Sequence, residues 1–123
     1  MILNLLRCKI HRAQVTNVNL NYEGSIGIDS EFMDMVGILP YEKVLIGNIA
    51  NGERFETYAF REPAGSKSIT LNGAAALLGK AGDLLVILTF ADFSLEEAKA
   101  WKPSLLVLGD ANQRILKLEK HEL

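Results

Sequence analysis

The most informative segment of this chain reads Asn21-Tyr22-Glu23-Gly24-Ser25-Ile26-Gly27-Ile28-Asp29. A serine that follows glycine can attack the carbonyl group of the peptide bond before it. Glycine has no side chain to obstruct that approach, and it tolerates a distorted backbone. Gly-Ser pairs are also common in turns, so the rest of the chain has to decide between a reactive serine and an ordinary turn serine.

The bulk composition points to one domain that folds around its own core. The chain has 123 residues, of which 49% are apolar, and a formal net charge of −2. Its basic residues are scattered, which argues against nucleic acid as a partner. Cys8 is the single cysteine, so an internal disulfide is impossible and no metal site is spelled out. We expect a cytoplasmic protein, because no run of residues reaches membrane-spanning length.

Strand patterns dominate the chain, and small helices interrupt them. Asn51-Gly52 is a favoured hairpin turn between two of the strands. A continuous apolar run predicts a buried strand over residues 84–90. Many short strands favour a closed β-barrel, so the predicted class is mainly β. The predicted strands cover residues 2–20 (as one or two strands), 25–28, 43–49, 53–60, 68–71, 84–90, 105–108 and 113–118.

The helical segments are short and carry clear end signals. Residues 31–36 form a predicted helix with Asp29 or Ser30 as its N-cap and Gly37 at its end. Residues 73–78 can start a helical turn. The capping box at 94–97 predicts a further helix, and the proline at 103 ends it. Residues 61–67 are predicted to form a loop and 79–83 a turn.

Arg54 and Tyr58 are the residues of the predicted strand over 53–60 that suggest chemistry. Strict alternation places both side chains on one face of the strand. A guanidinium group grips a carboxylate with two hydrogen bonds, and a phenol can donate a proton to a basic carbon. The alternative is cross-strand packing for Tyr58 and a solvated position for Arg54. Thr57 lies on the opposite face, so a bulge, a bend in the barrel or a neighbouring subunit would be needed to bring it to the same site.

Four segments together resemble the bacterial aspartate α-decarboxylase family. The similarity extends from about residue 5 to Pro103, and the tail after Pro103 is weakly specific. The resemblance implies a double-psi β-barrel with short helices, formed by residues 1–123 as one domain. It also implies self-cleavage into residues 1–24 and 25–123. The four segments are Lys9-Ile10-His11-Arg12, Gly24-Ser25, Asn51-Gly52-Glu53-Arg54-Phe55-Glu56-Thr57-Tyr58 and Asn72-Gly73-Ala74-Ala75-Ala76.

The chemistry implied by this resemblance starts at Ser25. Its hydroxyl would convert the amide to an ester, and elimination followed by hydrolysis would leave a pyruvoyl group as a covalent cofactor. The ketone would form a Schiff base with the amine of L-aspartate and accept electrons as carbon dioxide leaves. The product would be β-alanine, used for pantothenate and coenzyme A. The family also implies a homotetramer with its sites between subunits.

The same resemblance assigns a role to each candidate site residue. Ser25 and Tyr58 would be catalytic, with Tyr58 as the proton donor. Gly24, Ser25 and Thr57 would serve maturation, Thr57 by binding the developing oxyanion. Metal ligands are not expected. The roles of His11, which would share a strand face with Lys9, and of Tyr22 stay open. The substrate-binding residues would be Lys9, Arg54, Thr57, Asn72, Gly73, Ala74 and Ala75.

Two other functions compete with the decarboxylase. A non-enzymatic β-barrel module in an oligomer would remain uncut. A serine hydrolase would pair Ser25 with His11, although the nucleophile-elbow pattern is missing. The sequence also departs from the family at Gly27, where threonine is common, and we expect that glycine to loosen the strand after the cleavage site.

Overall fold

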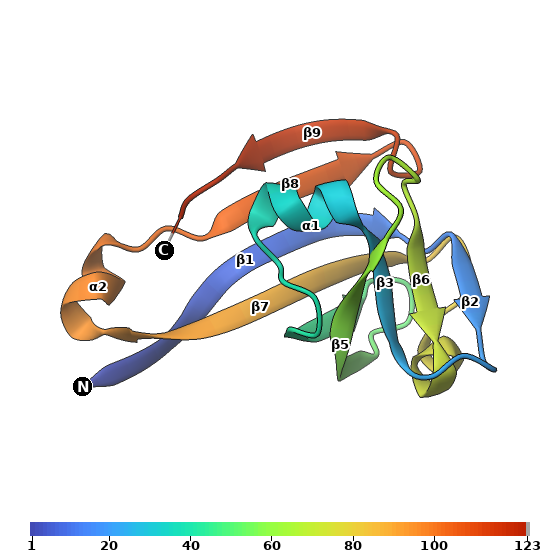
Figure 1. Cartoon of the computed structure of the whole chain (residues 1–123), viewed down its shortest axis with the longest axis horizontal. Helices are drawn as coiled ribbons and strands as arrows, with labels where there is room; N and C mark the ends of the chain where they lie inside the picture. Colours follow the sequence, from blue (N-terminus) through green and yellow to red (C-terminus); the bar gives the residue numbers. More distant parts are fainter. Residues whose placement is uncertain (123) are drawn as a thin grey trace.

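The computed structural model describes residues 1–122 and is mainly β (Figure 1). Its strands form one sheet in the order β2-β6-β3-β5-β4-β7-β1-β8-β9, and this confirms the predicted fold class. The elements are β1 (Ile2–Gln14), β2 (Asn17–Asn19), β3 (Ser25–Asp29), α1 (Ser30–Val36), β4 (Lys43–Asn48), β5 (Arg54–Glu62), β6 (Ile69–Asn72), η1 (Gly73–Leu78), β7 (Leu84–Ser94), α2 (Leu95–Ala100), β8 (Ser104–Gly109) and β9 (Arg114–Glu119).

Two long antiparallel strands, β1 and β7, cross the whole molecule side by side (Figure 1). The burial of β7 alternates from Leu84 to Phe90, so one face packs on the core and the other does not. The predicted buried strand is therefore buried along one face, while the other face is half-buried as far as Leu88. Its predicted end at Phe90 was too early, because β7 continues to Ser94 while it pairs with the first residues of β1. The core contains Ile10, Ile87 and other buried apolar side chains.

The strand β5 changes partners midway, and this positions the candidate site. Its first half pairs antiparallel with β4 as far as Tyr58, opposite Lys43. From Ala59 onward it pairs parallel with β3. Arg61 and Glu62 belong to this second ladder, so the predicted loop begins after Glu62 rather than at residue 61. The change of partner brings the middle of β5 next to the start of β3.

The helices follow their predicted end signals. Asp29 is the N-cap of α1, where its side chain accepts a hydrogen bond from Glu31 N–H, and Gly37 ends the helix at φ 82°. Ser94 and Glu97 form both bonds of the capping box at α2. The predicted turn at 73–78 is a 3₁₀ helix. In Figure 1, α2 lies at the end of the molecule where β1 begins, far from β3 and β6.

Candidate active site

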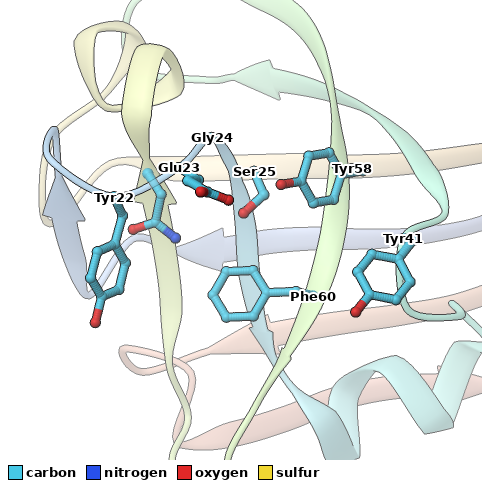
Figure 2. A pocket seen from close by; sticks show the side chains of 8 residues that line it. Tyr22, Glu23, Gly24, Ser25, Tyr41, Tyr58 and Phe60 are labelled. Atoms are coloured by element: carbon cyan, nitrogen blue, oxygen red, sulfur yellow. The ribbon is translucent and has the colours of Figure 1, made fainter.

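A pocket of about 410 Å³ opens beside the Gly24-Ser25 peptide bond. Residues from the loop before β3, from β3, β5 and β6, and from the turn before β4 surround it. In Figure 2, Ser25 lies between Glu23 and Tyr58, and aromatic rings form much of the wall. The pocket is lined by Tyr22, Glu23, Gly24, Ser25, Tyr41, Tyr58, Phe60 and Asn72.

Ser25 has a strained backbone at the base of this pocket. The residue is 2% exposed, and its φ is 107°. Residues other than glycine rarely adopt such a positive φ angle, and holding one there costs on the order of 1–3 kcal/mol. Gly24 has no positive φ, and a Cβ added to it would meet no atom within 4 Å. The backbone strain therefore lies at the serine, while the glycine leaves open space beside the carbonyl group.

The β6 strand pairs with the Gly24-Ser25 segment from the other side. Asn72 is buried and lies directly opposite Ser25 in the antiparallel ladder. Gly73 has φ 59°, and a Cβ there would approach Gly24 Cα to 2.8 Å. Only glycine allows this close approach of the two backbones. Of the two following candidates, Ala75 packs in the core and Ala74 is exposed, and neither side chain lines the described pocket.

Tyr58 reaches the pocket from the point where β5 changes partners. Figure 2 shows its hydroxyl pointing toward Ser25. Its ring lies 6.4 Å from the ring of Tyr41, at an interplanar angle of 36°. Aromatic pairs of this kind contribute about 0.5–1.5 kcal/mol beyond their buried area. The arrangement places a phenolic donor beside the residue that the sequence predicts to be reactive.

Phe60 occupies the part of the wall below Ser25 in Figure 2. It packs against Gly27, where an added Cβ would approach Phe60 Cζ to 2.9 Å and Thr70 Oγ1 to 2.3 Å. Thr70 Oγ1 in turn donates a hydrogen bond to Glu62 Oε1, 3.0 Å away. Gly27 is paired with strands on both sides. The expectation that this glycine loosens β3 was wrong, because neighbouring side chains fill the space of the missing Cβ.

Arg54 and Lys9 do not line the Ser25 pocket. The register places His11, Val86, Gly47 and Arg54 in one row across β1, β7, β4 and β5. Arg54 and Tyr58 share a face of β5, as predicted, but four residues of strand separate them by about 13 Å. Within residues 1–122, Arg54 makes no ion pair with an acidic side chain. A single chain therefore keeps its candidate carboxylate-binding cations away from Ser25.

Thr57 lies on the other face of β5 from Tyr58, opposite Val44 of β4. The β4–β5 ladder has no register shift, so a bulge does not turn Thr57 toward the pocket. Lys9 and His11 share the outer face of β1, because Cys8 and Ile10 between and beside them are buried. Burial lowers the pKa of His11 below its ordinary 6.5, with Lys9 and Arg12 adding to the effect.

Tyr41 and Phe60 are pocket residues that sequence patterns missed. A Pro-Tyr pair at 40–41 indicates a turn, yet nothing local says that this turn packs against β5. Phe60 follows the alternation of Tyr58, so the face of β5 was predictable although the pocket was not. Glu23 comes directly before Gly24, and its carboxylate faces Ser25 in Figure 2.

Residues 1–122 contain neither a candidate metal site nor a candidate membrane-spanning helix. The described side chains contain no cluster of three or more His, Cys, Asp or Glu placed to hold a metal ion. In the same part of the chain, no helix combines the length and the apolar character needed to cross a membrane.

Comparison with known proteins agrees with this geometry. The model of the family described as aspartate decarboxylase matches residues 1–115. The chain is 50% identical over 117 residues to the aspartate 1-decarboxylase of Thioalkalivibrio sulfidiphilus, covering 95% of this chain and 92% of that protein. It is 48% identical over 123 residues to the enzyme of the same name from Carboxydothermus hydrogenoformans, covering 100% and 96%. The fold, the strained Gly-Ser junction and these similarities together show that the chain belongs to the aspartate decarboxylase family.

Proposed function

We propose that this protein cuts itself between Gly24 and Ser25 and then decarboxylates L-aspartate to β-alanine and carbon dioxide. The observation that carries the proposal is the conformation of Ser25, a buried serine at φ 107° whose neighbours include the Tyr58 phenol. The strain raises the free energy of the intact junction and so favours its rearrangement. The product would supply pantothenate and coenzyme A synthesis.

Maturation would proceed through the atoms of the junction itself. Ser25 Oγ attacks the Gly24 carbonyl carbon, the peptide C–N bond breaks, and the hydroxyl proton passes to the freed amine. The resulting ester eliminates the Gly24 carboxylate and leaves an unsaturated residue at position 25. Water hydrolyses that residue to a keto group and releases ammonia. The open space beside Gly24 fits this attack, since nothing lies within 4 Å of the missing Cβ.

The residues around Ser25 also fit a covalent pyruvoyl group and a small amino acid. Such a group supplies a ketone that captures an amine and withdraws electrons during decarboxylation. The Tyr58 hydroxyl would return a proton to the carbon that loses carbon dioxide. Asn72 and the backbone at Gly73 and Ala74 would bind the substrate at the bottom of the pocket. The aromatic wall would exclude water from the reacting atoms.

The substrate carboxylates need cations that one chain keeps elsewhere. Lys9 and Arg54 do not line the pocket, and Arg54 lies about 13 Å along β5 from Tyr58. We therefore propose that a second copy of the chain, in a homotetramer, supplies this face to the Ser25 pocket. Thr57 would act at the same junction between subunits. The half-buried apolar side chains of Leu45, Val86 and Leu88 surround the cations, as expected for an oligomer interface.

Intact-mass measurement of purified protein tests the maturation step, and the chain contains its own control. Gly65-Ser66 is a second Gly-Ser pair, but Ser66 is exposed and has no positive φ. We expect fragments 1–24 and 25–123, the second lighter than a serine-started fragment by one ammonia, and no cut at residue 65. Ser25→Ala should stay whole and inactive, while Ser66→Ala should behave as wild type. Wild-type protein that stays whole after prolonged warming would favour the non-enzymatic module instead.

Tyr58→Phe separates maturation from turnover. Removing the hydroxyl leaves the ring and its contacts in place, so we expect normal cleavage. The rate of β-alanine formation should fall by about 10²–10⁴-fold, the usual contribution of a positioned proton donor. Cleavage is followed by mass and turnover by chromatography of β-alanine. Wild-type turnover in this variant would remove Tyr58 from the donor role.

A further inference from the structure

The turn that carries Tyr41 has an unusual residue at its third position. Residues 39–42 close through a hydrogen bond from Glu42 N–H to Leu39 C=O, 3.1 Å long. Pro40 occupies the second position, and Tyr41 occupies the third with φ 70°. This is the pattern of a type II turn, whose third position favours glycine or asparagine. A bulky aromatic residue is strained there.

The turn is fixed against β5 directly after Tyr58. Tyr41 N–H donates to Ala59 C=O over 2.7 Å, and Ala59 N–H donates to Glu42 C=O over 3.0 Å. Arg7 forms a two-bond ion pair with the Glu42 carboxylate and also donates to Gly37 C=O. These contacts hold the backbone of the turn, so the Tyr41 ring projects from a rigid base.

Burial of the Tyr41 side chain does not offset the backbone strain. The residue is 80% exposed and is not part of the core. Its contacts are with the pocket, where its ring lies against the ring of Tyr58. In Figure 2, Tyr41 lies on the side of Tyr58 and Phe60 that faces away from Tyr22. A strained residue that adds nothing to the core points to a role in the site.

We propose that Tyr41 is a positioning residue that holds the Tyr58 ring with its hydroxyl directed at Ser25. This inference rests on the proposed function, in which Tyr58 donates the proton. Tyr58 is itself 39% exposed and can adopt other rotamers on the solvent side. The Tyr41 ring occupies that side and restricts the rotation of Tyr58. Because the ring does this, the hydroxyl of Tyr41 is dispensable.

The test compares Tyr41→Gly, Tyr41→Phe and, as a control in the same turn, Leu39→Ala. Tyr41→Gly should be cut normally and should keep a Tm at or above that of wild type, because glycine relieves the turn. Its kcat should fall by about two- to twelvefold, the size expected when an aromatic pair is lost, with KM unchanged within error. Tyr41→Phe and Leu39→Ala should keep the wild-type kcat.

A second readout does not depend on activity. The chain has three tyrosines, so fluorine NMR of protein labelled with 3-fluorotyrosine gives three assignable signals. We expect the Tyr58 signal of Tyr41→Gly to move toward that of free fluorotyrosine and that of Tyr41→Phe to stay in place. If wild type makes no β-alanine but this shift occurs, the proposed function fails and the packing role stands.

Three results would overturn the proposal. A Tyr41→Gly variant with wild-type kcat and an unmoved Tyr58 signal shows that the ring does not position Tyr58. A Tyr41→Phe variant that loses as much kcat as Tyr41→Gly shows that the hydroxyl acts instead. A loss of activity that accompanies a change in assembly size, measured by light scattering, assigns Tyr41 to a contact between subunits.

Discussion

Ser25 and Ser66 both follow a glycine, yet their surroundings differ completely. Ser25 is buried with a positive φ, whereas Ser66 lies exposed in a loop, where its Oγ accepts a hydrogen bond from Ser68 N–H. A dipeptide alone therefore does not define a reactive junction. The difference comes from β6, which pairs with β3 at Ser25, and from Gly73 directly after it, whose backbone packs closely against Gly24.

Replacement of the single residue Gly27 is predicted to destabilise the fold. Gly27→Ala should lower the free energy of unfolding by about 1–3 kcal/mol, because the new methyl group overlaps Thr70, Glu62 and Phe60. Urea unfolding monitored by circular dichroism measures the loss. Gly47→Ala is the matched control in a strand, since its nearest neighbour is the flexible end of Arg54 at 3.9 Å. Equal losses in the two variants would contradict the packing argument.

His11 should make stability depend on pH. Its Nδ1 atom is buried and has no hydrogen-bond partner within residues 1–122, and burial together with Lys9 and Arg12 lowers its pKa below 6.5. The unfolded chain then binds a proton more readily than the folded chain. Above pH 6.5, His11 is neutral in both states and the folded chain keeps its full stability. As the pH falls below 6.5, the unfolded chain binds the proton first, and the free energy of unfolding decreases.

Urea unfolding of wild type at pH 8 and pH 5.5 measures this decrease. We expect His11→Gln to show a weaker fall in stability between the two pH values than wild type. His121→Gln, at the other histidine, is the control and should keep the wild-type fall. If His11→Gln loses as much stability as wild type on acidification, the titration of another group is responsible.

At the scale of elements, β5 organises the site because it belongs to two ladders. Its antiparallel half with β4 ends at Tyr58, and its parallel half with β3 begins at Ala59. The same change of partner draws the turn at Tyr41 into contact with Ala59. The pocket therefore lies where one strand passes from one ladder to the next, and its wall comes from both.

The start of α1 is tied to a distant loop by one buried carboxylate. Asp29 Oδ1 accepts from Glu31 N–H and Gly65 N–H, and Oδ2 accepts from Lys67 N–H. Asp29→Ala should cost about 2–3 kcal/mol of unfolding free energy, because three backbone N–H groups lose a charged acceptor. Chemical unfolding checks this value.

Asp34→Ala is the control for the Asp29 variant on the same helix. Asp34 pairs with Arg61 in an exposed ion pair, and such pairs contribute about 0–1 kcal/mol. Asp29→Asn, which keeps one acceptor oxygen, should fall between the two. A loss for Asp29→Ala no larger than that for Asp34→Ala would refute the anchoring role of this carboxylate.

At the scale of the whole molecule, one chain separates the two halves of the proposed site. The Ser25 pocket and the face with Lys9 and Arg54 do not meet. Ser25→Ala and Arg54→Ala should each be inactive for different reasons. Co-expressed, they should form mixed assemblies in which one subunit supplies Arg54 and another supplies the Ser25 pocket, so part of the β-alanine formation should return.

The control for this experiment is the pair Ser25→Ala and Tyr58→Phe. Both changes lie in the same pocket of one chain, so mixing should restore nothing. If the mixture of Ser25→Ala and Arg54→Ala also stays inactive, while light scattering shows normal assembly, the proposed site between subunits is wrong.

Local patterns in the sequence were sufficient for most elements. The capping box at Ser94, the Asp29 cap and the Asn51-Gly52 turn were all predicted correctly, because each depends on groups only a few residues apart. The end of β7 was missed because β1, far away in the sequence, extends its pairing. The placement of Thr57 on the face of β5 opposite to Tyr58 was predicted correctly, since alternation is a property of the strand itself.

The sequence alone determined the class of fold and the faces of the strands, and it predicted Gly24-Ser25 as the candidate junction. The tertiary structure alone decided that Asn72, Tyr58 and Tyr41 surround that junction, that Gly27 makes room for Phe60, and that Arg54 lies elsewhere. The physical reason is that a strand's own geometry repeats over two residues, whereas its neighbours are set by burial of the whole core. Distant segments meet only when that core closes.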